Sequence, residues 1–70
     1  MSESVYKVIE LVGSSPESFE KATAAAIHLA SRTLRDLRVA EVSQLDVTIK
    51  DGKVEAYRAK LKISFKYEAQ

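Results

Sequence analysis

The chain has 70 residues, no cysteine, one histidine, and a net charge of +1 from eleven basic and ten acidic side chains. A chain this short forms one domain, expected over residues 1–70, and buries only about 60% of its unfolded surface, so partner subunits are its main remaining source of stability. The near-neutral charge argues against nucleic acid, no apolar run reaches the about 18 residues of a membrane span, and the polar start predicts a cytoplasmic protein.

The first element is a predicted strand over residues 5–12, in which β-branched and aromatic residues make both faces apolar. The segment 13–16, Gly-Ser-Ser-Pro, then predicts the end of this strand and the start of a helix. Ser15 is the expected N-cap, and Pro16 suits the first helical position.

A helix is predicted from Pro16 to about Leu37, because apolar residues recur there with helical period. The buried stripe is rich in alanine, which permits close approach of a sheet. Its expected members are Phe19, Ala22, Ala26, Ala30, Thr33, Leu34 and Leu37. His28 lies on the opposite, polar face and is interpreted as a solvated helical histidine.

Two further strands follow, joined by Asp51-Gly52, which is a strong signal for a type I′ hairpin turn. The first is predicted over residues 39–49, with a bulge near Ser43-Gln44 that reconciles its two apolar registers. The second alternates cleanly and buries its odd-numbered face. That face comprises Tyr57, Ala59, Leu61, Ile63, Phe65 and Tyr67.

These elements predict an α+β fold with β-α-β-β order, in which a three-stranded antiparallel sheet wraps around one helix. Such a sheet leaves two unpaired edges, and the first strand is apolar on both faces. Neighbouring copies of the chain are the natural source of edge pairing and burial, so a closed homo-oligomer is expected.

The sequence does not contain the residues for a recognisable catalytic site. His28 has no nucleophile motif around it, and Gly13 and Gly52 belong to no phosphate-binding glycine loop. We therefore predict that the protein is not an enzyme.

Carboxylates and basic residues leave two binding interpretations open. Within one chain the carboxylates have no cation-binding spacing, but across a symmetric interface they could form a calcium or magnesium site, for which the candidates are Glu10, Asp46 and Asp51. The basic even face of the last strand could bind phosphates, although cross-strand pairing with Glu10 and Asp46 is the favoured interpretation.

The order and spacing of several short strings resemble the dodecin family. The strings are VYKVIELVGSSP at 5–16, LRDLR at 34–38 leading into Glu41-Val42, the Asp51-Gly52 hairpin, and LKISF at 61–65. The resemblance covers nearly the whole chain and implies a β-α-β-β subunit that assembles into a hollow dodecamer and commonly binds flavin.

Flavin-binding dodecins carry a Trp that stacks on the flavin and a Gln that hydrogen-bonds its edge, and the resemblance places Val39 and Arg58 at those positions. Val cannot stack, and Arg supplies donors only, so the usual flavin site is expected to be lost. Glu41 is a candidate partner for Arg58 in this altered pocket. The chain is similar to a branch of the family in which calcium binding has been attributed to a relative.

The resulting hypothesis is a homododecameric shell that binds or stores a small molecule or an ion. The alternative is a structural or interaction particle that holds no cargo.

Overall fold

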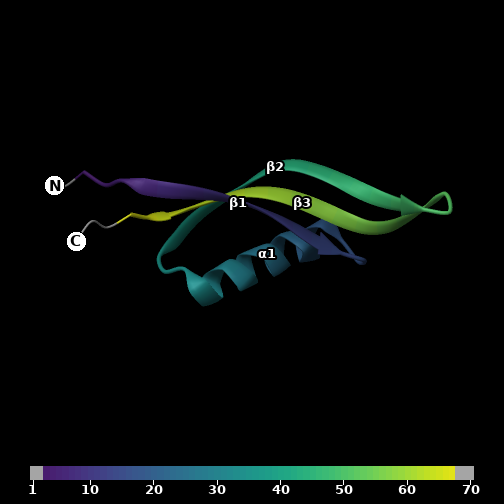
Figure 1. Ribbon diagram of the computed structural model, residues 1–70, viewed down its shortest axis with the longest axis horizontal. Helices are drawn as coiled ribbons and strands as arrows, with labels where there is room; N and C mark the ends of the chain where they lie inside the picture. The colour runs from purple at the N-terminus through teal and green to yellow at the C-terminus, as the bar shows by residue number, and fades with distance from the viewer. Residues whose placement is uncertain (1–2, 68–70) are drawn as a thin grey trace.

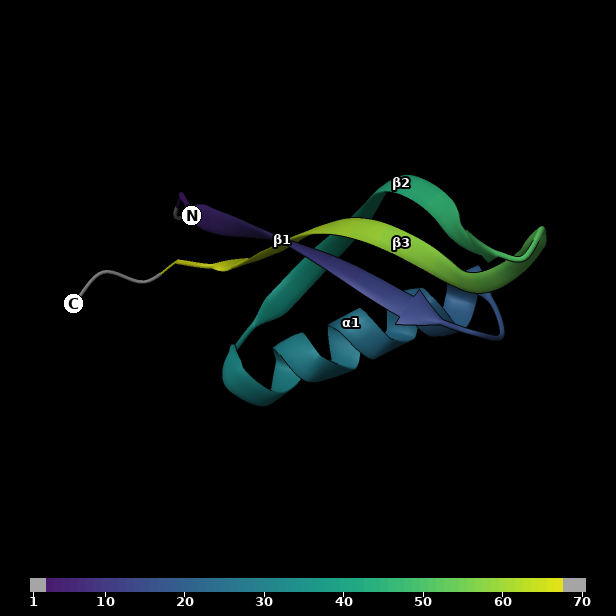
Figure 2. The same cartoon turned by 45° about the vertical axis from the view of Figure 1, so that its right-hand side comes forward.

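The computed structural model describes residues 3–67 and has four elements: β1 (Tyr6–Ser15), α1 (Phe19–Thr33), β2 (Leu37–Lys50) and β3 (Lys53–Lys66). The strands form one antiparallel sheet in the order β1-β3-β2, so β3 is central and the other two strands are edges. The helix lies along one side of this sheet (Figures 1 and 2). The predicted α+β architecture, a β-α-β-β unit with an antiparallel sheet around one helix, is confirmed.

We call the side of the sheet that faces α1 the inner face and the opposite side the outer face. The inner face of β3 supplies the centre of the core, where Ala59 and Leu61 are fully buried and Ile63 is 1% exposed. The predicted odd-numbered core face of β3 is thereby confirmed for these positions. Tyr67 is a correction, because it follows the end of β3 and is 53% exposed.

The helix packs through its small side chains, since Ala22, Ala26 and Ala30 are all buried, as the sequence predicted. Gly13 on β1 permits this close approach. A Cβ atom at Gly13 would lie 2.0 Å from the carbonyl oxygen of Ala22, which is backbone and cannot move without moving the helix. His28 is exposed, in agreement with its interpretation as a solvated residue.

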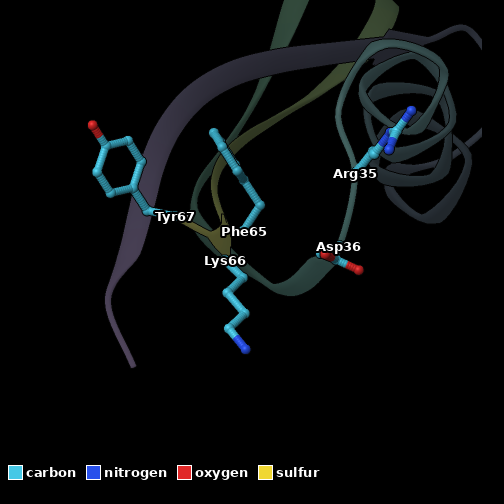
Figure 3. A pocket seen from close by; sticks show the side chains of 5 residues that line it. All are labelled: Arg35, Asp36, Phe65, Lys66 and Tyr67. Carbon is cyan, nitrogen blue, oxygen red and sulfur yellow. The ribbon is translucent and has the colours of Figure 1, made fainter. Parts of the chain in front are cut away.

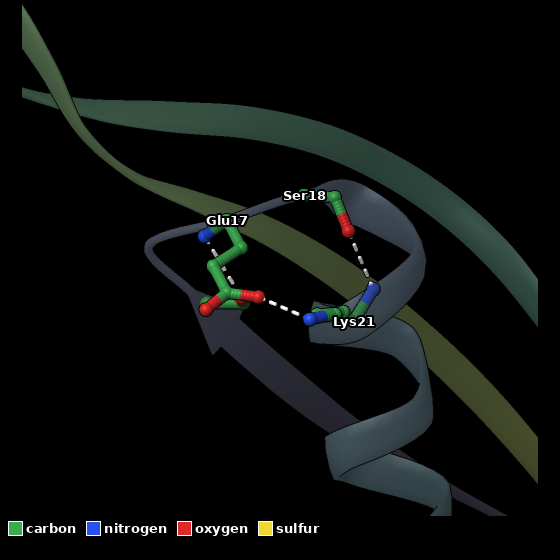
Figure 4. Close-up of polar contacts among 4 residues, drawn as sticks. Glu17, Ser18 and Lys21 are labelled. Carbon is green, nitrogen blue, oxygen red and sulfur yellow. Dashed lines mark hydrogen bonds and ion pairs between the residues drawn. The ribbon is translucent and has the colours of Figure 1, made fainter.

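The helix begins three residues later than predicted. Ser18, not Ser15, is the N-cap: its hydroxyl accepts a hydrogen bond of 3.0 Å from the backbone N–H of Lys21 (Figure 4). Ser15 instead ends β1, and its hydroxyl accepts the N–H of Glu17 at 3.0 Å, which makes a local turn. The ion pair between Lys21 and Glu17 adds a contact across the first turn.

The helix also ends earlier than predicted, at Thr33 rather than near Leu37. Leu34 has an extended backbone and donates its N–H to the carbonyl of Ala30 at 2.9 Å. Asp36 has a φ of 58°, a left-handed conformation that reverses the chain. Leu34 and Leu37 still pack against the core, but Leu37 does so as the first residue of β2.

The strands are longer than the sequence indicated. Gly13 and Ser15 pair with Ala59 and Tyr57, so β1 continues past the predicted end at residue 12. The predicted bulge is confirmed by a register shift between Val42 and Gln44.

The type I′ hairpin is confirmed by positive φ angles of 54° at Asp51 and 76° at Gly52. This hairpin extends beyond the first turn of α1 (Figure 1). No helix within residues 3–67 is long and apolar enough to cross a membrane.

Candidate ligand face of the sheet

The outer face carries the site residues that the sequence singled out on the strands. Strand alternation and pairing register arrange them in rows across the sheet. From one end to the other, the rows are Val8-Ser64-Val39, Glu10-Lys62-Glu41, Val12-Lys60-Gln44 and Ser14-Arg58-Asp46, each written in the spatial order β1-β3-β2. A central basic strip on β3 is therefore flanked by carboxylates from both edge strands.

Arg58 and Asp46 form a two-point ion pair at one end of this basic strip. The Nε and Nη2 atoms of Arg58 donate to the two carboxylate oxygens of Asp46 at 2.7 and 2.9 Å. These hydrogen bonds hold the pKa of Asp46 below its ordinary value and raise the pKa of Arg58. The predicted partner Glu41 is not the one used, because Glu41 lies opposite Lys62 in another row.

Lys62 lies between Glu10 on β1 and Glu41 on β2. Among the described residues, neither carboxylate forms a direct ion pair with Lys62, so this row balances charge by proximity alone. The favoured interpretation of the basic face, pairing across strands, is confirmed for Asp46, which binds Arg58. Glu10 lies opposite Lys62 but forms no ion pair with it in the described part of the chain.

Val39 is 63% exposed at the other end of the outer face. Its carbonyl accepts a hydrogen bond of 3.3 Å from the hydroxyl of Ser64, its neighbour on β3. Because Ser64 and Arg58 are six residues apart along β3, Val39 and Arg58 are separated by about 20 Å in one chain. A single subunit does not bring the two residues into one pocket, and Glu41 lies between them.

A groove of about 190 Å³ lies beside Val39, between the first residues of β2 and the middle of α1. Its lining is mainly apolar. The lining residues are Ile27, Leu37, Arg38, Val39, Ala40 and Ile63.

The three candidate metal ligands lie far apart within one chain. Glu10 is in the middle of β1, Asp46 is paired with Arg58 on β2, and Asp51 is at the tip of the hairpin. Within residues 3–67, no three His, Cys, Asp or Glu side chains are grouped closely enough to hold a metal. A cation site built from these residues therefore requires carboxylates from more than one subunit.

A hollow that the sequence analysis missed lies where the α1–β2 connection meets the end of β3 (Figure 3). Its volume is about 350 Å³, and it is lined by Arg35, Asp36, Phe65, Lys66 and Tyr67. The Lys66 N–H donates to the Asp36 carbonyl at 3.3 Å, which joins the two segments. No local pattern predicts this contact, because the left-handed turn at Asp36 creates it.

These features place the chain in the class of small α+β subunits in which one helix covers part of a long antiparallel sheet. The Dodecin family model matches residues 5–68, and the chain therefore belongs to the dodecin family.

Three relatives illustrate the similarity. The calcium dodecin of Mycobacterium tuberculosis is 44% identical over 63 residues, which cover 90% of this chain and 89% of the relative. The dodecin of Thermus thermophilus is 42% identical over 64 residues, covering 91% and 93%. The solved dodecin structure from Streptomyces coelicolor is 40% identical and covers the whole of both chains with a TM-score of 0.93.

The Mycobacterium tuberculosis calcium dodecin has also been solved, as a calcium-chelating antigen with a novel calcium-binding site. That structure is 44% identical, covers 96% of each chain, and superposes with a TM-score of 0.83.

Proposed function

We propose that this chain is a single-domain subunit of a hollow homododecamer that binds or stores a small molecule or an ion. The shell works in the cytoplasm and has no enzymatic activity. The observation that carries the proposal is the uncovered half of the inner face, which the subunit leaves in solvent.

This uncovered half belongs to β2 and the hairpin. Leu45 is 50% exposed, although it pairs with the buried Ala59 and therefore points to the inner face. Ile49, close to the hairpin turn, is 68% exposed. Val42 and Val47 extend the same patch. A soluble monomer rarely exposes an apolar surface of this kind along an unpaired edge strand, whereas a second copy of the chain would cover it.

The altered pocket supports a shell that has lost the usual flavin site. Val39 offers no aromatic surface, and the guanidinium of Arg58 is already engaged by Asp46. A flavin edge needs a donor and an acceptor together, which a paired guanidinium does not supply.

An ion is the better-supported cargo, because a relative at 44% identity is a calcium dodecin. Calcium binds six to eight oxygen ligands, so separate carboxylates from several subunits would have to converge. Glu10 and Asp51 remain the candidates without an ion pair in the described part of the chain, whereas Asp46 would have to leave Arg58. Magnesium is the second candidate ion.

The assembly and its cargo are tested together. Sedimentation velocity at micromolar concentration is expected to show one large species, and a folded monomer near 7.8 kDa would refute the shell. Purified protein is expected to lack flavin absorbance and to melt at a higher temperature with calcium. A yellow preparation would refute the loss of the flavin site.

The altered pocket is tested by restoring it. The double variant Val39→Trp/Arg58→Gln is expected to bind riboflavin about ten- to a hundredfold more tightly than the parent, because it regains a stacking ring and paired hydrogen bonds. Quenching of flavin fluorescence measures the affinity. The two single variants are the matched controls, and Arg58→Gln should improve binding more than Val39→Trp because it removes a charged group.

A structural particle without cargo is the alternative. It is favoured by the outer face, where carboxylates from the edge strands neutralise the basic strip. A large assembly whose stability responds to neither flavin nor calcium would support this alternative.

A further inference from the structure

The row that contains Arg58 differs in its chemistry from the row that contains Lys62. Lys62 has a carboxylate on each side, whereas Arg58 has Asp46 on one side and the neutral Ser14 on the other. Among the strand residues that the structure describes, Asp46 is therefore the one carboxylate beside Arg58 at this end of the basic strip.

The next row reinforces the difference. Lys60 lies two residues from Arg58 on the same face, and its neighbours are Val12 and Gln44, which carry no charge. Without Asp46, a guanidinium and an ammonium, carried by strand positions about 7 Å apart, would face solvent together. A hydroxyl from Ser14 and an amide from Gln44 would flank them, and these are the groups that bind phosphate oxygens.

Asp46 prevents this through geometry. The guanidinium fork binds a carboxylate or a phosphate with the same two parallel donors, so one fork cannot serve both at once. Both contacts to Asp46 are short, at 2.7 and 2.9 Å, so the Nε–Nη2 edge that forms the fork is occupied and the guanidinium charge is neutralised. The Asp46 side chain is 45% exposed and the Arg58 side chain 44%, so the pair lies where a ligand would otherwise reach the fork.

We propose that Asp46 is a specificity-determining residue of the outer face, which excludes phosphate-bearing ligands by occupying the Arg58 fork. The inference deepens the proposed function, because it says which class of small molecule this face of the shell rejects. Neutral ligands and cations do not compete with Asp46 for Arg58 and remain admissible.

The test measures binding of inorganic pyrophosphate by isothermal titration calorimetry at low ionic strength. Asp46→Ala is expected to bind pyrophosphate at least about tenfold more tightly than the parent, since charge-assisted hydrogen bonds become available. Asp46→Asn keeps one acceptor oxygen and should fall between the two. Added salt should weaken the gained binding.

Glu41→Gln is the matched control, because it removes one negative charge from the same strand and face but leaves Arg58 paired. Its affinity is expected to stay within about twofold of the parent. Asp46→Ala/Arg58→Gln should lose the gain. An equal gain in Glu41→Gln would overturn the proposal in favour of net charge, as would tight binding by the parent or no gain in Asp46→Ala.

Sedimentation of every variant separates this inference from the proposed function. An assembled Asp46→Ala that gains no affinity overturns the inference alone. A parent chain that does not assemble overturns the shell, while a gain in Asp46→Ala would still support the role of Asp46.

Discussion

The inner face of the sheet has two halves. Both carry apolar side chains, but one half is covered by the helix and the other is exposed to solvent. On β3, Leu61 and Ile63 lie under α1 and are essentially inaccessible to solvent. On β2, Val42 pairs with Leu61 in the sheet but is 44% exposed, and Leu45 beyond it is 50% exposed. The difference arises because the fifteen-residue helix α1 packs mainly on β1 and β3 and leaves β2 beyond Ala40 largely uncovered (Figure 2).

The alternation of apolar and polar residues therefore identifies which face of a strand is apolar, but it does not tell which element covers that face. The covered half holds the subunit together, since burial of apolar surface contributes about 25 cal/mol per Å². The bare half contributes little to the isolated subunit and is available for association. A disruptive substitution in the covered half should therefore unfold the subunit, whereas one in the bare half should prevent association of folded subunits.

The largest effect is expected for Leu61→Asp, which places a charge in the centre of the covered half. Because Leu61 is fully buried, the substitution should cost at least about 3–5 kcal/mol and abolish both folding and assembly. Circular dichroism and sedimentation measure the two losses. Lys60→Asp is the control on the outer face and should stay folded, and equal behaviour of the two variants would invert the assignment of the faces.

A smaller loss of folding stability is expected for Gly13→Ala, which pushes β1 away from α1. The added Cβ would overlap the carbonyl of Ala22, so the helix must shift at a cost of about 1–3 kcal/mol. Urea unfolding measures it. Gly52→Ala is the control: nothing lies within 4 Å of its Cβ, and only the positive φ of 76° should cost about 1 kcal/mol. A parent-like Gly13→Ala would mean that the two elements are not in tight contact.

The bare half is tested by Leu45→Asp, which is expected to keep the secondary structure and lose the assembly. The charge remains partly solvated in the subunit but would be buried without a partner in an interface. Sedimentation velocity should show a smaller species with an unchanged far-ultraviolet spectrum. Gln44→Asp, next to it on the outer face, should assemble normally, and an intact assembly of Leu45→Asp would show that β2 is not an interface.

The smallest effect is expected on the opposite side of the sheet, at the Asp46–Arg58 pair. The pKa of Asp46 is lowered from 3.8 by hydrogen bonds from Arg58, so its stabilising contribution is complete above pH 3.8. It is lost as the pH falls through the lower pKa of the folded state. Exposure of the pair keeps the contribution small.

This pH dependence is measured by urea unfolding of the parent and Asp46→Asn at several pH values. The difference in unfolding free energy should be constant near neutral pH and shrink below the ordinary pKa of aspartate. A difference that grows in acid would contradict the direction of the shift.

Much of this architecture was predictable because it depends on local chemistry. The alternation from Tyr57 to Phe65 indicates a half-buried strand, Asp51-Gly52 predicts positive φ angles, and the alanine stripe predicts close packing of a helix on a sheet. Which of two neighbouring serines caps the helix was less predictable. Ser15 and Ser18 can both cap a helix, and pairing of β1 with β3 as far as Ser15 decided in favour of Ser18.

The site residues divide in the same way. The sequence by itself determined that Val39 cannot stack on a ring, that Arg58 can only donate, and that the even-numbered face of the last strand is basic, since these are properties of side chains and strand period. Only the tertiary structure decided that Arg58 pairs with Asp46 rather than Glu41, because the bulge at Ser43 sets the register between β2 and β3. It also decided which apolar residues stay bare, because that depends on where a single helix lies across three strands.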